Sequence, residues 1–376
     1  MAIFESLYFY ATYIVPFIFV LSIVVFFHEL GHFLVGRWCG VKVDVFSIGF
    51  GPELFSRIDQ HGTRWRVAAV PLGGFVKFHG DVNAASVADH ELIAAMPADE
   101  RAISFYTQKV WKRAAIVAAG PVANFLLAIV IFTAVFFAFG REVLNPRVQD
   151  VRAGEAGALA GFEPGDLVVA IDGTPIASWA AMQRVIQSSA GVPLNFTIHR
   201  GSKQVSLTAT PTLREIKTAF GTQRIGMIGL SAAAAPSDWR LERYSIGESL
   251  KLGLSETWFV VERTAAFVAG LVAGREAADN ISGPIGIAHM AGEVAKVGIV
   301  PLFSFAALLS VSIGLMNLLP VPLLDGGHLL YYAVEFVRGR PLSEKTQEVG
   351  FRIGLAMVGA LMLFATANDI FRKMLG

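Results

Sequence analysis

Four long stretches without a charged residue constrain the fold of this chain more than any other feature. They are residues 6–27, 114–140, 297–324 and 353–368. A helix needs about 20 mostly apolar residues to cross a bilayer, because unpaired backbone groups are costly in lipid. The last stretch is shorter, so Arg352 beside it would have to extend its side chain toward the membrane surface. The pattern predicts a membrane protein with about four transmembrane helices.

The composition agrees with this prediction. Hydrophobic residues make up 54% of the 376 and charged residues only 16%, whereas a soluble domain has about 25% charged residues. The 31 basic residues balance the 30 acidic ones, so we expect no nucleic-acid partner. The single cysteine, Cys39, excludes an internal disulfide framework and a cysteine-rich zinc site.

The distribution of Lys and Arg predicts the orientation in the bilayer. No basic residue precedes Arg37, ten lie in residues 37–113, and four lie in residues 338–352. We therefore expect the N-terminus on the outer side and both basic loops in the cytoplasm. A further apolar segment, residues 252–273, is interrupted by three charged residues. It is expected to form an amphipathic helix that lies on the membrane or packs against the spans.

Residues 141–212 differ from the rest of the chain, because charges return and glycines separate short β-branched runs. Residues 166–171 and 194–198 are expected strands, and residues 178–188 are an expected helix. Together they predict a small α+β domain outside the membrane. Residues 213–296 are expected to be a linker followed by the amphipathic helix.

The first span leads into the sequence His28-Glu29-Leu30-Gly31-His32. Residues four apart share one face of a helix, so His28 and His32 can direct two imidazoles at one metal ion. Glu29 can reach a metal-bound water, which is the arrangement of a zinc protease. The alternative is a pair of interfacial histidines bonded to neighbouring helices. The position favours a metal site, because polar groups at membrane depth are costly unless they have a function.

A catalytic zinc usually has three protein ligands and one open position, so a third ligand must come from elsewhere. Asp325 is the candidate, as the first charge after the third span. Two prolines precede it and two glycines follow it, which predicts a helix broken at membrane depth beside protein or a water-filled cavity. Asn317 can hold a substrate backbone or a developing oxyanion, or else cap or bridge helices. His328 is left out, because a fourth ligand would close the site.

Further motifs occur almost from end to end of the chain: residues 28–32, 46–52, 70–77, 119–125, 281–285 and 317–328. With them the chain resembles the site-2 proteases, a family of intramembrane zinc metalloproteases, and most closely the bacterial RseP type. Residues 146–212 resemble a PDZ domain of bacterial proteases. The resemblance implies that His28, His32 and Asp325 bind one Zn²⁺, that Glu29 is the catalytic base and that Asn317 assists with the substrate.

The resemblance also implies a fold: a polytopic α-helical membrane protein with an inserted membrane-associated β-hairpin region and one α+β PDZ domain. Residues 1–140 would hold the first two spans and the hairpin, residues 141–212 a periplasmic PDZ domain, and residues 297–376 the last two spans. In the hairpin, Gly73 and Gly74 would help an edge strand to bind an unwound substrate. The familiar enterobacterial enzymes have two PDZ domains, whereas this chain is expected to have one.

The function implied is the second cleavage in regulated intramembrane proteolysis, in the bacterial inner membrane and near its cytoplasmic side. Substrates would be single-span membrane proteins, such as an anti-sigma factor or signal-peptide remnants, and the PDZ domain can take a peptide ligand. Two other functions fit parts of the sequence. One is an inactive receptor that presents the PDZ domain, and the other is a zinc transporter lined by His and Asp. Retention of Glu29 beside His28 argues against both.

Overall fold

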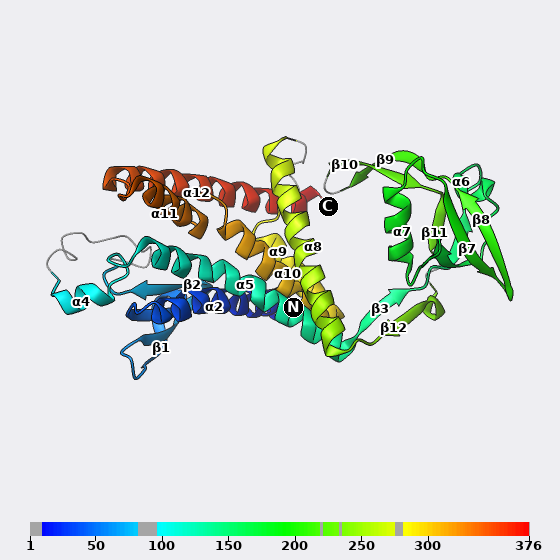
Figure 1. Cartoon of the computed structure of the whole chain (residues 1–376). Helices are drawn as coiled ribbons and strands as arrows, with labels where there is room; N and C mark the ends of the chain where they lie inside the picture. Colours follow the sequence, from blue (N-terminus) through cyan, green and yellow to red (C-terminus); the bar gives the residue numbers. More distant parts are fainter. Residues whose placement is uncertain (1–9, 82–95, 219–220, 233–234, 275–280, 376) are drawn as a thin grey trace. The chain divides into compact units, whose positions relative to one another are not determined.

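The computed structural model describes residues 10–81, 96–218, 221–232, 235–274 and 281–375 (Figure 1). The chain divides into two compact units. The first comprises residues 1–135, 247–266 and 278–376, and the second comprises residues 136–246 and 267–277. Each unit is described by itself.

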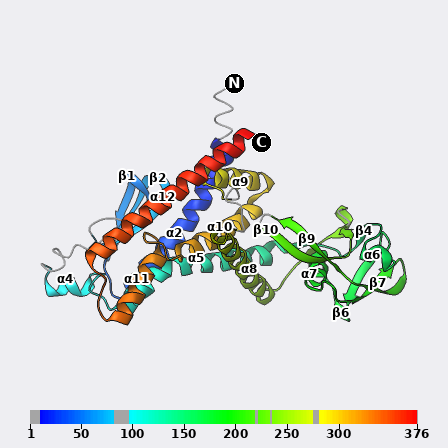
Figure 2. The same ribbon diagram turned by 90° about the horizontal axis from the view of Figure 1, so that it is seen from above.

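Four helices of the first unit are long and apolar enough to cross a membrane: Ala11–Trp38, Val110–Phe139, Ile299–Asn317 and Lys345–Phe371 (Figures 1 and 2). They belong to α2 (Val15–Trp38, preceded by the π-turn η1, Tyr10–Ile14), α5 (Val110–Phe139), α10 (Ile299–Asn317) and α12 (Glu344–Leu375). The prediction of about four membrane-spanning helices is confirmed. Residues 6–9 of the first predicted stretch lie outside the described residues.

The third and fourth predicted stretches differ in how they fold. Within the third, residues 297–324, α10 ends at Asn317 and α11 (Asp325–Arg338) begins after an irregular segment, so the predicted break before Asp325 is confirmed. The fourth helix is much longer than residues 353–368. Hydropathy marks only the part of a helix that is apolar, whereas the polar turns of α12 continue the same backbone hydrogen bonding.

A buried carboxylate joins α12 to α9 (Pro284–Val297). Asp369 of α12 is 8% exposed. Its oxygens accept hydrogen bonds from the backbone N–H groups of Gly283, at 3.1 Å, and Gly286, at 2.8 Å. These N–H groups begin α9 and have no partner within that helix, so Asp369 supplies the cap that the helix's own sequence lacks. The charge also suits the positive end of the helix dipole.

The segment expected as an amphipathic helix forms α8 (Ile246–Val272). Its middle packs closely on α5: a Cβ added to Gly253 would lie 3.0 Å from the backbone nitrogen of Thr133. Ser249 and Thr257, one turn on either side of Gly253, are also buried. Small residues four apart allow helix backbones to approach closely in a membrane. Of the two expected positions for this helix, the structure therefore shows packing against a span.

Two long strands, β1 (Val43–Ile58) and β2 (Arg64–Phe78), form an antiparallel sheet that bends back on itself. Residues 45–48 pair with residues 74–77 on one side and with residues 64–67 on the other. The second half of β2 is therefore an edge of the sheet. Phe46 is buried and its ring lies 5.6 Å from that of Phe33 in α2, which fixes the sheet to the first span.

The second unit is an α+β fold. Its elements are β3 (Arg141–Leu144), β4 (Val148–Val151), α6 (Ala156–Leu159), β5 (Leu167–Ile171), β6 (Thr174–Pro175), α7 (Trp179–Ser188), β7 (Leu194–Arg200), β8 (Lys203–Ala209), β9 (Thr212–Thr218), β10 (Gly221–Met227), β11 (Leu230–Ala232), η2 (Pro236–Asp238) and β12 (Trp239–Glu242). The largest sheet has the order β6-β5-β7-β8. The two expected strands and the expected helix are all present, and α7 begins where the Ser178 hydroxyl accepts a hydrogen bond from the Ala181 N–H.

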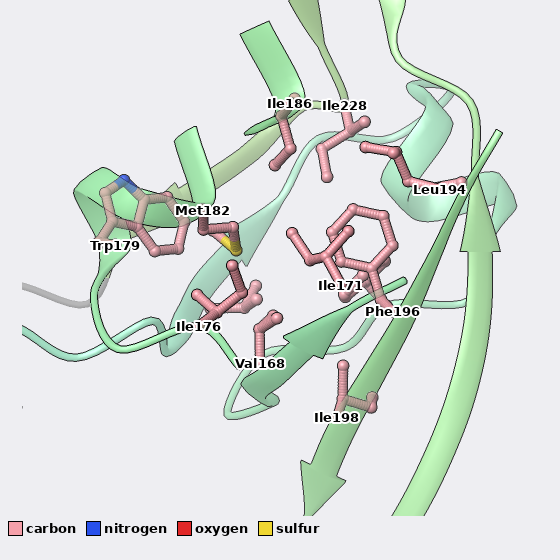
Figure 3. Packing of buried hydrophobic residues seen from close by; sticks show 13 residues of the cluster. Val168, Ile171, Ile176, Trp179, Met182, Ile186, Leu194, Phe196, Ile198 and Ile228 are labelled. Carbon is pink, nitrogen blue, oxygen red and sulfur yellow. The ribbon is translucent and has the colours of Figure 1, made fainter. Parts of the chain in front are cut away.

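The core of this unit lies between α7 and the sheet (Figure 3). Met182 and Ile186 of α7 point toward Phe196 and Ile198 of β7 in a cluster of buried side chains. At the end of β7, Arg200 donates a hydrogen bond to each oxygen of the fully buried Asp166, both at 2.8 Å. This bidentate pair closes the glycine-rich turn before β5 and explains why an aspartate stands there.

The predicted boundary at residue 212 is corrected by the strand pairing. Residues 213–232 are not a linker, because β9 pairs with β10, and β11 pairs with β4. The final strand, β12, pairs with β3 at the start of the unit. Short strands of mixed composition carry little local signal, and β11 and β12 pair with strands distant in the sequence, β4 and β3.

Candidate metal centre

Three side chains from two helices converge in the first unit. His28 and His32 lie on one face of α2, and Asp325 is the first residue of α11. One ligand atom from each lies within 4.8 Å of the other two. The Nε2 atom of His28 is 3.2 Å from His32 Nε2 and 3.2 Å from an oxygen of Asp325. Among the described residues this is the one group of three potential ligands, and His328 is not a member.

The second histidine is oriented by the neighbouring span. His32 Nδ1 lies 2.9 Å from the backbone oxygen of Ile116 in α5. A carbonyl oxygen only accepts, so Nδ1 of a neutral His32 carries the hydrogen and donates it. The lone pair is then on Nε2, the atom that faces His28 and Asp325.

Two glycines allow α2 and α5 to cross at this point. A Cβ on Gly31, between the two histidines, would collide with the backbone oxygen of Ala119. A Cβ on Gly120 would collide with the ring of His32 and lie 2.9 Å from Cε1 of His28. The space that a side chain at residue 120 would fill is therefore occupied by the two imidazoles.

Asp325 reaches the histidines because the chain turns back sharply before it. The segment between α10 and α11, residues 318–324, packs so tightly over the start of α11 that a Cβ on Gly326 or on Gly327 would collide with its backbone oxygens. Leu323 has a φ of 97°, a region that residues with a side chain rarely adopt. Strain of this kind persists only where the surroundings enforce it, and here it lies two residues from the carboxylate.

A buried ion pair holds α11 against α5. Arg113 Nη2 lies 2.6 Å from Glu335 Oε1, with the two side chains 11% and 12% exposed. The same guanidinium is 4.9 Å from the centre of the Tyr332 ring, also on α11. Both contacts fix the helix whose first residue is Asp325, and a bond of this kind orients as much as it stabilises.

Glu29 lies between the cluster and the edge of the sheet. The backbone N–H of Val76 in β2 donates a hydrogen bond to its carboxylate. A Cβ on Gly74 would lie 3.0 Å from Glu29 Cγ and 2.9 Å from Val25. Glycine at residue 74 therefore allows the edge strand to approach the carboxylate next to His28.

The other two residues predicted to bind substrate, Gly73 and Asn317, lie farther from the cluster than Gly74. Gly73 faces the Phe50 ring within the sheet, where a Cβ would lie 2.9 Å from Cζ. Asn317 is the last residue of α10 and is half-buried, at the start of the segment that leads to Asp325. The structure gives neither residue a contact with the three potential ligands.

The cluster fits a zinc ion by its chemistry. Two imidazole nitrogens and one carboxylate oxygen are a common set of three protein ligands for catalytic zinc. One oxygen of Asp325, Oδ2, is buried and has no hydrogen-bond donor among the described residues, although it lies beside His28 Nε2. A cation between Asp325 Oδ2 and His28 Nε2 would give each of these two atoms a partner. The residues present therefore fit the metal that the sequence implied.

Two residues near the cluster were given no role by sequence reasoning, although both lie in the motif at residues 119–125. Gly120 and Asn124 both lie on α5, and Asn124 Nδ2 is 3.2 Å from His28 Nδ1. The sequence pattern that could have identified them is Gly-x-x-x-Asn within an apolar span, because this spacing places a small and a polar residue on one helix face. An amide inside a span is costly and therefore a candidate for a role.

Comparison with known proteins places this site in a family. The model of peptidase family M50 matches residues 16–361. A protein of Agrobacterium fabrum named as a zinc metalloprotease is 48% identical over 359 residues, covering 95% of each chain. Metalloprotease MmpA of Caulobacter vibrioides is 42% identical, covering 96% of this chain and 95% of its own. A Vibrio cholerae relative, also named as a zinc metalloprotease, is 31% identical over 95% of this chain and 98% of its own.

The fold and the site thus define a multi-pass membrane metalloprotease. The chain belongs to peptidase family M50, the site-2 proteases, and is a zinc metalloprotease.

Replacing Asp325 by Asn should weaken the metal site strongly. The amide keeps the size of the side chain but loses the negative charge that faces both histidines. Loss of a residue that only orients a ligand typically costs 10- to 100-fold in metal affinity, so loss of a ligand should cost at least about 100-fold. Zinc per chain, measured after dialysis against a mild chelator, checks this. The matched control is Asp369→Asn, which changes a buried carboxylate outside the cluster. If Asp325→Asn retains zinc, Asp325 does not belong to the ligand set.

Proposed function

We propose that this protease cleaves single-span membrane proteins within or near the bilayer, as the second cut of regulated intramembrane proteolysis. The observation that carries the proposal is the position of the metal cluster. His28, Glu29 and His32 lie within a candidate span, residues 11–38, and Asp325 follows another. A peptide bond must reach membrane depth to meet these residues, and a membrane-spanning substrate places its backbone there.

The edge of the sheet beside Glu29 supports this choice of substrate. A peptide bond within a helix is shielded, so a helical substrate must be unwound before attack. Residues 74–78 pair with β1 on one side, and no described strand pairs with their other side. An extended peptide can add to such an edge by backbone hydrogen bonds. Apolar side chains of the sheet are exposed, including Leu54 at 70%, Phe55 at 65% and Leu72 at 59%, which suits insertion into lipid.

The residues have distinct roles in the proposed reaction. His28, His32 and Asp325 hold one Zn²⁺ per chain. When bound, the ion polarises a carbonyl and lowers the pKa of water. Glu29 removes a proton from the attacking water and later delivers it to the leaving amine, as a general base and then a general acid. The edge strand at Gly73 and Gly74 holds the substrate extended, and Asn317 bonds its backbone.

The second unit is proposed to be a periplasmic PDZ domain that excludes substrates with a large outer domain. Its glycine-rich turn and its α+β core agree with the resemblance of residues 146–212. In this unit β11 pairs with β4, and no other described strand pairs with β11. A peptide ligand could add there as a further strand. The Lys and Arg distribution supports an orientation with the metal cluster near the cytoplasmic side, and the bacterial sources of the relatives agree with an inner-membrane location.

Cleavage of a reconstituted model substrate tests the function. The purified protein, in vesicles, is given one single-span substrate in two forms: with a folded outer domain and with that domain removed. We expect the truncated form to be cut at least tenfold faster, and chelation of zinc to stop the reaction. Cutting of both forms at the same rate would contradict the role of the second unit.

If neither form is cut while zinc is bound, the protease function is contradicted and the alternative of an inactive receptor is favoured. Zinc flux into sealed vesicles is the measurement for the transporter. We expect none, because Glu29 beside His28 serves hydrolysis and a transport path does not require it.

A further inference from the structure

Asn124 is the most deeply buried polar side chain next to the metal cluster. It lies on α5, 0% exposed, with Nδ2 3.2 Å from His28 Nδ1. Its backbone oxygen accepts a hydrogen bond of 2.9 Å from the Ser310 hydroxyl in α10. Gly314 on the same helix allows α10 to approach, since a Cβ there would lie 3.1 Å from that of Asn124. The residue is thus fixed in place by a second helix.

The geometry of His28 decides which of its nitrogens must carry hydrogen. His28 Nε2 faces His32 and Asp325, so this is the atom that would bind a metal. A nitrogen that binds a metal contributes its lone pair, and the hydrogen of the neutral ring is then on Nδ1. Nδ1–H needs an acceptor, and the group beside it is the side-chain amide of Asn124.

The amide orientation in the structure leaves two groups unsatisfied. An amide nitrogen only donates, so it cannot accept from Nδ1–H. The Asn124 oxygen, Oδ1, is buried and has no hydrogen-bond partner among the described residues. Turning the amide by half a turn exchanges the oxygen and the nitrogen, which have nearly the same shape. The oxygen then faces Nδ1–H, so one change provides partners for both groups.

We propose that Asn124 is a positioning residue whose oxygen accepts a hydrogen bond from His28 Nδ1–H. It thereby holds His28 in the tautomer that presents Nε2 to the metal. The Ile116 carbonyl orients His32 in the same way. Ile116, Gly120 and Asn124 are four residues apart on one face of α5, so a single helix face orients both histidines and leaves space for them. This inference rests on the metal site of the proposed function.

Metal affinity of three variants tests the proposal. Asn124→Leu removes the acceptor at nearly constant size, Asn124→Asp keeps it, and Ser310→Ala removes the bond to the Asn124 backbone but not the acceptor. Co²⁺ affinity of the purified protein is measured by competition with a chelator, together with the visible absorption of bound Co²⁺. We expect Asn124→Leu to bind 10- to 100-fold more weakly with an altered spectrum. Asn124→Asp and Ser310→Ala should stay within about threefold of the wild type.

The outcomes separate this inference from the proposed function. If the wild type itself binds no Co²⁺ or Zn²⁺, the metal site fails and so does the proposed function. If the wild type binds and Asn124→Leu binds equally well, only the role of Asn124 is overturned. Should Asn124→Leu not fold, Asn124→Asp decides: wild-type affinity supports the acceptor, and a loss as large as that of Asp325→Asn overturns it.

Discussion

Replacing Glu29 by Gln should abolish cleavage while zinc stays bound. Glu29 is not one of the three residues whose ligand atoms cluster, so all three potential metal ligands remain in this variant. The amide keeps the size of the side chain but cannot take up a proton. General acid–base catalysis contributes about 10²- to 10⁴-fold, so cleavage of the truncated substrate should fall by at least that range. The measurement is the initial rate of cleavage, with zinc content determined on the same preparation.

The control for this variant is Glu335→Gln, which also removes a buried carboxylate but lies at the ion pair with Arg113. It should lower thermal stability and retain measurable cleavage. If Glu29→Gln cuts at the normal rate, Glu29 is not the base. If it loses zinc as completely as Asp325→Asn, Glu29 belongs to the metal set and its assignment changes.

Replacing Gly120 by Ala should remove the metal site by steric means alone. The added methyl group would occupy the space of the His32 ring and approach His28. The His32 ring cannot yield freely, because its Nδ1 is bonded to the Ile116 carbonyl on the same helix. We expect zinc per chain below about a tenth of the wild-type value, since displacement of both histidines costs more than loss of one orienting bond.

Gly359→Ala is the matched control for this steric test. Gly359 lies in α12, where a Cβ would meet nothing within 4 Å. Alanine in a helix is favoured over glycine by about 1 kcal/mol, so Gly359→Ala should be slightly more stable with normal zinc content. Thermal unfolding of both variants without metal separates a folding defect from a blocked site. Full zinc content in Gly120→Ala would show that the two rings do not occupy this space in the protein.

The local parts of the molecule could be predicted from sequence. Hydropathy located four spans, because lipid requires long runs of apolar residues whatever their tertiary contacts. The pairing of His28 with His32 follows from helical periodicity, which acts over a single turn. The strands and the helix of residues 166–198 were likewise evident from local pattern and composition.

Tertiary structure decided which distant residues meet. Asp325 could be selected as a candidate by its position after a span, but only the folded segment at residues 318–324, packed against Gly326 and Gly327, places it beside His28. The roles of Gly120 and Asn124 depend on how α5 crosses α2, and the spacing of residues within one helix does not specify that crossing.

The same distinction applies to the second unit. Residues 213–232 were expected to be a linker, because short strands carry little signal of their own, and β11 pairs with β4, which lies far back in the sequence. The sequence by itself therefore determined the bilayer segments and the two histidines, whose causes act within one element. Tertiary structure alone decided the complete cluster, the space around it and the extent of the second unit, because each depends on contacts between elements distant along the chain.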